Sequence, residues 1–174
     1  MSRFDFREKV LPSDTEAVRG LIGSAGRFSA EETRIAVELV EERLAKGPAC
    51  GYHFIFVEEA GAETRPTAGY ACYGPRDERP ALFDLYWIAV AEAARGQGLG
   101  SRLLELTEQR ALAMGGKELI AETSSREDYA DARRFYEARG FTLLRTVERF
   151  YGPRDHRLDY GKDLLSEPFE DSQM

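Results

Sequence analysis

The run Arg95-Gly96-Gln97-Gly98-Leu99-Gly100 contains the residue types that hold a phosphate group. It follows a strongly apolar segment and leads into leucines at helical spacing. Glycines let the backbone turn tightly and let N–H groups face an anion without a Cβ in the way. A helix N-terminus adds about half a positive charge, and Arg95 adds a full one. The run therefore predicts a pyrophosphate cradle formed by a loop and the start of a helix.

Two other phosphate motifs do not match this run. The dinucleotide fingerprint requires Gly-x-Gly-x-x-Gly, and its third glycine is missing whether counting starts at Gly96 or at Gly98. Glu122 lies at about the offset of the acid that binds ribose in that motif, but the glycine mismatch argues against it. The triphosphate loop ends in Gly-Lys-Ser or Gly-Lys-Thr, which the run lacks. A strand-to-helix turn whose glycines serve geometry alone is the simplest alternative.

A second motif lies downstream, Ala132-Arg133-Arg134-Phe135-Tyr136-Glu137-Ala138-Arg139-Gly140-Phe141. The two motifs together resemble the GCN5-related N-acetyltransferase (GNAT) superfamily. Arg95-x-x-Gly98-x-Gly100 is similar to its acetyl-coenzyme A signature, and Ala-x-x-Phe-Tyr-x-x-x-Gly-Phe is similar to the helix and strand that follow it. The resemblance covers most of the chain, from residue 3 to about residue 165. It implies acetyl transfer but does not indicate which amine is acetylated.

The resemblance also implies which residues bind the coenzyme. The end of the apolar strand would bind the pantetheine arm by strand-like hydrogen bonds, and the loop and helix start would bind the pyrophosphate. These residues, with one from the start of the second motif's helix, are Ile88, Ala89, Val90, Arg95, Gly96, Gln97, Gly98, Leu99, Gly100, Ser101 and Tyr129. Many members of the superfamily carry asparagine where this chain has Tyr129, so the chain departs from the family pattern there.

Tyr136 occupies the position of a tyrosine that protonates the departing thiolate in the superfamily. The resemblance therefore implies that Tyr136 is a catalytic acid. The alternative is a core aromatic on an amphipathic helix. Phe135 is the better core candidate of the two, because adjacent helix positions point about 100° apart.

The base that would accept a proton from the substrate is less sharply defined. A primary ammonium group has a pKa of about 10 and must lose a proton before it attacks a thioester. Asp84 is the one charged residue in the apolar run 82–90, and its even spacing from Ile88 and Val90 predicts a common strand face. The alternatives are that Asp84 is paired with an arginine or with backbone N–H groups, that Glu122 is the base, or that water carries the proton.

Composition excludes several other classes of protein. The 174 residues include 24 Lys and Arg against 31 Asp and Glu, which gives a net charge of −7. Such a chain disfavours binding to nucleic acid or to anionic membranes. No apolar run reaches the roughly 18 residues of a membrane span, and the N-terminal residues lack the apolar core of a signal peptide. With only two cysteines and two histidines, no metal site is expected, and a cytoplasmic location is predicted.

The remaining sequence predicts the elements that position these motifs. Capping boxes at Ser13–Glu16, Ser29–Glu32 and Ser125–Asp128 predict helix starts. The run 82–90 predicts a central strand covered on both faces. Further strands are expected at 4–6, 52–58, 67–73, 118–123, 141–151 and 156–163, and helices from 99 to 114 and up to Arg139. This order predicts an α/β (α+β) fold with a mixed, mostly antiparallel sheet of about six to seven strands and helices on both faces.

These expectations combine into one functional interpretation. Residues 1–165 form a single acetyltransferase domain, followed by a polar tail at 166–174. The chain transfers acetyl from acetyl-CoA, its cosubstrate, to a primary amine in a ternary complex, as a monomer or homodimer. The alternative is an inactive coenzyme A-binding module that acts as a sensor or scaffold. Aromatic segments expected to shape the acceptor pocket are Arg27-Phe28, Tyr52, Tyr73 and Phe150-Tyr151.

Overall fold

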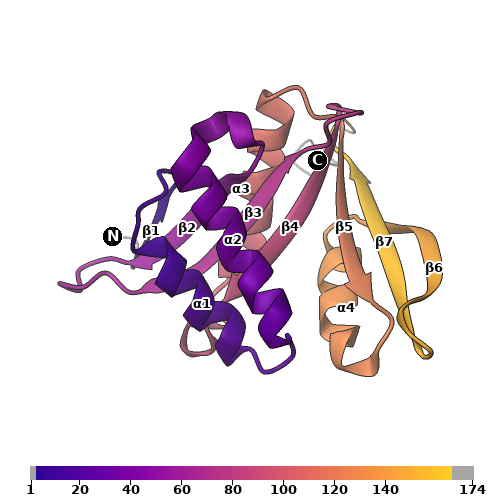
Figure 1. Cartoon of the computed structure of the whole chain (residues 1–174), viewed down its shortest axis with the longest axis horizontal. Coiled ribbons are helices and arrows are strands. Elements are labelled where there is room, and N and C mark those ends of the chain that lie inside the picture. The colour runs from indigo at the N-terminus through magenta and orange to yellow at the C-terminus, as the bar shows by residue number, and fades with distance from the viewer. Residues whose placement is uncertain (1–2, 166–174) are drawn as a thin grey trace, which may run out of the picture. The chain divides into compact units, whose positions relative to one another are not determined.

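The computed structural model describes residues 3–165 and contains four α-helices and seven strands within them (Figure 1). In chain order they are β1 (Phe4–Arg7), α1 (Asp14–Ser24), α2 (Ala30–Lys46), β2 (His53–Glu59), β3 (Thr67–Pro75), β4 (Leu82–Val90), α3 (Leu99–Ala113), β5 (Glu118–Ser124), α4 (Ala130–Ala138), β6 (Thr142–Gly152) and β7 (Asp155–Asp163). The polar tail expected at 166–174 lies outside the described residues.

The seven strands form one mixed sheet in the order β1-β2-β3-β4-β5-β7-β6. β4 pairs with β5 in parallel, whereas β1 with β2, β2 with β3, β5 with β7, and β6 with β7 are antiparallel. The α/β class and the mixed, mostly antiparallel sheet predicted from the sequence are therefore confirmed. Because β7 lies between β5 and β6, the β6–β7 hairpin places its second strand inside the sheet and its first strand at the edge.

Contacts between residues group the chain into two compact units. The first unit contains residues 3–74 and 86–109, with β1 to β3, the second half of β4, α1, α2 and most of α3. The second unit contains residues 75–85 and 110–165, with the first half of β4, β5 to β7 and α4. Each unit is described separately below.

The first unit has helices on both faces of its strands, with α1 and α2 in front of β2 and β3 and α3 behind them (Figure 1). The front core is aromatic: Phe54, Phe56 and Tyr70 stack with ring centroids 5.7–6.4 Å apart. Apolar residues of α1 and α2 cover these rings, including Val18, Ile22 and Val40. Cys72 belongs to the same core and is fully buried, so it packs as a small hydrophobic residue.

Only one of the capping boxes predicted in this unit forms. Ser29 accepts a hydrogen bond from the Glu32 N–H, and the Glu32 carboxylate accepts one from the Ser29 N–H. The box predicted at Ser13 is wrong, because the Ser13 side chain makes no cap bond. The adjacent Asp14 carboxylate is buried, and it accepts from the Leu11 N–H and from both terminal nitrogens of Arg7.

Side chains alternate regularly along the second half of β4. Trp87 and Ala89 pack against the front core, and so does Ala91 just after the strand. Ile88 and Val90 therefore belong to the opposite face of the strand. Tyr86 is the one exposed side chain of β4, at 38%, and its ring centroid lies 5.4 Å from that of Tyr52.

The second unit is built on β5, β7 and α4. α4 packs through Tyr136, whose ring contacts Phe141 and Tyr160 with centroids 5.4 and 6.3 Å away. The box predicted at Ser125 is wrong, because α4 starts after Tyr129 and has no side-chain cap. The Ser125 hydroxyl instead accepts a hydrogen bond from the N–H of His156. Gly140, with φ of 90°, follows α4 in the left-handed conformation that is common after a helix C-terminus.

Candidate active site

The loop before α3 has the backbone geometry of an anion cradle. Gly96 and Gly98 have φ angles of 78° and 76°, a conformation that other residues rarely adopt. A Cβ at either glycine would meet no atom within 4 Å, so backbone conformation and not crowding requires glycine at both positions. The loop is therefore open where a bound group would approach.

The helix that follows completes the cradle. The carbonyl of Gly98 accepts from the N–H of Arg102, which makes Gly98 the first carbonyl acceptor of α3. The N–H groups of the first helical turn have no acceptor within a helix and carry the positive end of its dipole. Arg95 is exposed immediately before this turn. The residues predicted to bind a pyrophosphate thus have the geometry and charge to do so.

The end of β4 is accessible in the first unit. Ile88, Ala89 and Val90 are each only half-buried, although they belong to the most apolar strand. A Cβ at Gly69 would lie 2.8 Å from the carbonyl oxygen of Ala89, so glycine is required where β3 passes this segment. The close approach holds the backbone of the segment in place.

Tyr136 is 7% exposed, whereas Phe135 is half-buried. The expectation that Phe135 is the better core residue is therefore wrong. Burial raises the pKa of the Tyr136 hydroxyl above its usual value, so that it stays protonated at neutral pH. The rings of Phe141 and Tyr160 fix the Tyr136 ring, and Tyr160 is held by donating a hydrogen bond to Glu137 over 2.9 Å.

Tyr129 lies at the N-terminal cap of α4 and is half-buried. The guanidinium of Arg126 lies over its ring, 5.6 Å from the centroid. The aromatic residue at this position thus packs against a cation at the helix start.

Three carboxylates occupy neighbouring strands of the second unit. The register pairs Asp84 of β4 with Ile120 of β5, and Glu122 of β5 with Asp159 of β7. Because Ile120 and Glu122 are two residues apart on one strand, the three acidic side chains share one face of the sheet.

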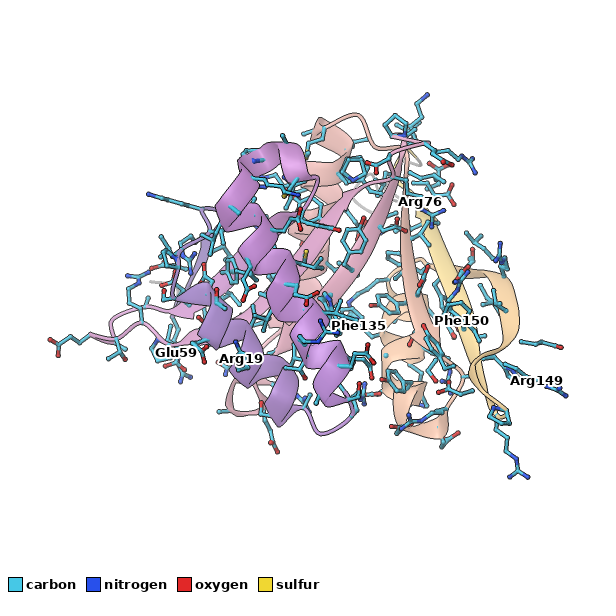
Figure 2. All side chains as sticks on the ribbon, viewed as in Figure 1. Arg19, Glu59, Arg76, Phe135, Arg149 and Phe150 are labelled. Atoms are coloured by element: carbon cyan, nitrogen blue, oxygen red, sulfur yellow. The ribbon has the colours of Figure 1, made fainter. Side chains whose placement is uncertain are left out.

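The two outer carboxylates of this row are each bound by an arginine. Arg76, labelled in Figure 2, donates to both oxygens of Asp84, over 2.8 and 2.9 Å. Arg157 donates to both oxygens of Asp159, over 2.9 and 3.2 Å. The structure therefore realises, for Asp84, the arginine-paired alternative that the sequence left open.

Glu122 is the middle carboxylate, and within residues 3–165 it forms no ion pair. The residue is exposed as a whole, yet desolvation of its carboxyl raises the pKa. The charges of Asp159 and Asp84 raise the pKa further, and those of Arg157 and Arg76 oppose the rise. Burial also raises the pKa of nearby Tyr151 to about 12, so its hydroxyl stays neutral beside Glu122.

Sequence reasoning missed the arginines and the second aspartate of this cluster. Arg76 is eight residues before Asp84, and Arg157 and Asp159 follow Glu122 by more than 30 residues. Only the β5–β7 register brings the second pair beside Glu122. The one available signal was the alternation of charged residues in the stretch 155–159, which places Arg157 and Asp159 on one face.

A mixed seven-stranded sheet with a glycine turn before the helix that follows β4 is the architecture of an acetyltransferase. Residues 23–141 match the model of the acetyltransferase (GNAT) family. The chain belongs to this family.

Solved structures agree with the assignment. A GNAT-family protein from Desulfovibrio desulfuricans is 43% identical, with a TM-score of 0.88 over 92% of this chain and 99% of that one. YncA from Salmonella typhimurium, solved with acetyl-CoA, is 21% identical, with a TM-score of 0.70 over 98% and 99%. The ribosomal-protein-S18-alanine N-acetyltransferase of Escherichia coli is 19% identical, with a TM-score of 0.72 over 95% and 97%. The last two show the fold alone.

Comparison with curated proteins gave no match. Among residues 3–165, no helix combines the length and apolar character needed to cross a membrane.

Proposed function

We propose that this chain is an acetyl-CoA-dependent N-acetyltransferase. It transfers the acetyl group to the primary amine of a small molecule, an amino acid or a peptide N-terminus, by direct attack in a ternary complex. The observation that carries the proposal is the cradle before α3, where Gly96 and Gly98 are left-handed and Arg95 is exposed. Together with membership of the acetyltransferase family, this geometry supports coenzyme A as the ligand.

Different segments of the chain bind different parts of the coenzyme. The run 95–101 binds the pyrophosphate through backbone N–H groups and the Arg95 guanidinium. The segment 88–90 binds the pantetheine arm by strand-like hydrogen bonds, and a backbone N–H in this segment holds the carbonyl oxygen as it gains negative charge. Tyr129 contacts the coenzyme from the start of α4.

Glu122 is the favoured proton acceptor. A base must have a free lone pair and a pKa not too far below that of the amine. Asp84 was the first candidate, but both of its oxygens accept from Arg76. Glu122 forms no ion pair within the described residues, and desolvation raises its pKa towards that of the amine. Asp84 then acts indirectly, by holding Arg76 away from Glu122.

Tyr136 is the proposed acid. The amine nitrogen bonds to the acetyl carbon, the carbon–sulfur bond breaks, Glu122 takes a proton from the amine, and Tyr136 donates a hydrogen bond to the departing sulfur. A thiol has a pKa of about 8.5, well below that of a buried tyrosine. Tyr136 therefore contributes mainly as a hydrogen-bond donor that stabilises the thiolate, and full proton transfer is completed through solvent.

A panel of amines tests this function. The full chain is incubated with acetyl-CoA and each amine, and the release of free thiol is followed. Amine-dependent release supports N-acetylation. Binding of acetyl-CoA without release for any amine supports the inactive coenzyme A-binding module instead, and absence of binding overturns both.

A further inference from the structure

Arg157 can reach two different carboxylates. It lies two residues from Asp159 on β7, and the register places it diagonally from Glu122 on β5. Diagonal neighbours on a sheet are about 7–8 Å apart, within reach of a long side chain. In the structure, both of its donating nitrogens point to Asp159.

Further contacts hold this arrangement. The Arg157 guanidinium lies over the ring of Phe150, labelled in Figure 2, 4.5 Å from the centroid. Arg145 of β6, which is opposite Asp159 in the ladder, also approaches this carboxylate, with 3.9 Å between its Nε and Oδ2. Asp159 is only 9% exposed and is contacted by two arginines.

We infer that Arg157 and Asp159 are a positioning pair, in which Asp159 retains the guanidinium that would otherwise bind Glu122 and block it as a proton acceptor. This inference rests on the proposed function, since it gives the pair a purpose only if Glu122 accepts the proton. Arg76 and Asp84 form the equivalent pair on the other side of Glu122. The Glu122 carboxylate lies between these two ion pairs, and neither arginine forms an ion pair with it.

The charged and titratable groups that act on Glu122 come from neighbouring strands and one loop. Arg157 and Asp159 lie on β7, Tyr151 on β6, Asp84 on β4, and Arg76 in the loop just after β3. The tyrosine stays neutral at working pH. Two of the acidic groups are bound by arginines at both oxygens, so a change in either pair changes the field at Glu122 directly.

Titration of Glu122 by NMR of its side-chain carboxyl, in the full chain without substrate, tests the inference independently of activity. Asp159→Asn frees Arg157 and removes a like charge, so the Glu122 pKa should fall by about 1 unit. Arg157→Gln should raise it by a similar amount, and the double variant should return it towards the wild-type value. The two variants shift the Glu122 pKa in opposite directions, so either one alone still tests the inference if the other folds poorly.

Asp128→Asn is the matched control. Arg126 and Asp128 form a pair of the same spacing, over 3.0 and 2.6 Å, elsewhere on the second unit. The control should leave the Glu122 titration unchanged. A Glu122 pKa that is the same in wild type, Asp159→Asn and Arg157→Gln overturns the inference.

The pH dependence of kcat/KM then separates the inference from the proposed function. If both are correct, the acid limb moves to lower pH in Asp159→Asn and to higher pH in Arg157→Gln, in step with the NMR values. If the NMR values move while the acid limb stays fixed, the pair controls Glu122, but Glu122 is not the base. That result overturns the proposed role of Glu122 and the purpose assigned to the pair.

Discussion

Glu122 on β5 and Asp159 on β7 are directly opposed in the antiparallel ladder, yet only Asp159 is bound by an arginine. Opposed carboxylates repel each other. Binding one of them to a guanidinium relieves the repulsion and leaves the other available. This relationship links the sheet register to the chemistry proposed for the site.

Replacing Glu122 by glutamine should lower activity and raise stability. Because the folded-state pKa is raised, the stability contribution of Glu122 is present below its unfolded pKa and is lost as pH rises through the folded pKa. At pH 7 the charged carboxylate therefore destabilises the fold, and Glu122→Gln should raise the melting temperature. Its kcat/KM should fall most at neutral pH, with the deficit shrinking towards about pH 10, where the amine deprotonates unaided.

Asp84→Asn is compared with Glu122→Gln in both measurements, the melting temperature and the pH dependence of kcat/KM. Loss of the carboxylate leaves Arg76 without its bidentate partner, so the melting temperature should fall. If Asp84→Asn instead shows the pH profile expected for Glu122→Gln and keeps the wild-type melting temperature, the base role belongs to Asp84.

Tyr136→Phe should lower kcat and leave the affinity for acetyl-CoA nearly unchanged. Phenylalanine keeps the ring contacts with Phe141 and Tyr160, so only the hydroxyl is lost. General acid catalysis contributes a factor of about 10²–10⁴ to the rate. Because the pKa of Tyr136 is raised, we expect the loss in kcat to be near the lower end of this range. Steady-state kinetics measure kcat, and calorimetric titration measures the affinity for acetyl-CoA. Full activity in the mutant would restrict Tyr136 to packing.

Gly98→Asp should abolish binding of acetyl-CoA. Aspartate tolerates a left-handed conformation better than most residues, so the fold should survive, but its charge would oppose the pyrophosphate. Gly61→Asp is the matched control, because Gly61 also has a positive φ of 85° and open space around its Cβ position. Thermal shift with and without acetyl-CoA gives the readout. Equal stabilisation of both variants by the ligand would refute the cradle.

Tyr70→Phe should stabilise the first unit. The Tyr70 hydroxyl is buried and has no hydrogen-bond partner within residues 3–165. An unsatisfied buried polar group costs about 1–3 kcal/mol, so removing it should raise the free energy of unfolding by an amount of that order. Tyr160→Phe is the contrasting variant, since it loses the bond to Glu137 and should be less stable. Urea denaturation measures both, and a destabilised Tyr70→Phe would contradict the assignment.

Local signals in the sequence predicted much of the fold. The run 82–90 corresponds to β4 without error, and the box at Ser29 forms because all its partners lie within four residues. The box at Ser13 does not form, and the neighbouring Asp14 is bound by Arg7 of β1. Strand and helix positions depend on nearby residues, and the choice among competing polar partners depends on the whole fold.

The site was predicted less completely for the same reason. The glycine loop was recognisable because its chemistry is contiguous in sequence. The environment of Glu122 depends on residues from β4, β7 and the loop after β3, which meet only through the sheet.

Transfer of a labelled acetyl group tests the central claim most directly. Acetyl-CoA carrying an isotopic label at the acetyl carbonyl is incubated with the full chain and an amine that triggers thiol release, and the products are identified by mass spectrometry and NMR. The account predicts that the label appears in an amide of that amine, one for each thiol released. Label recovered as acetate, or thiol release that does not depend on the amine, would contradict N-acetyl transfer.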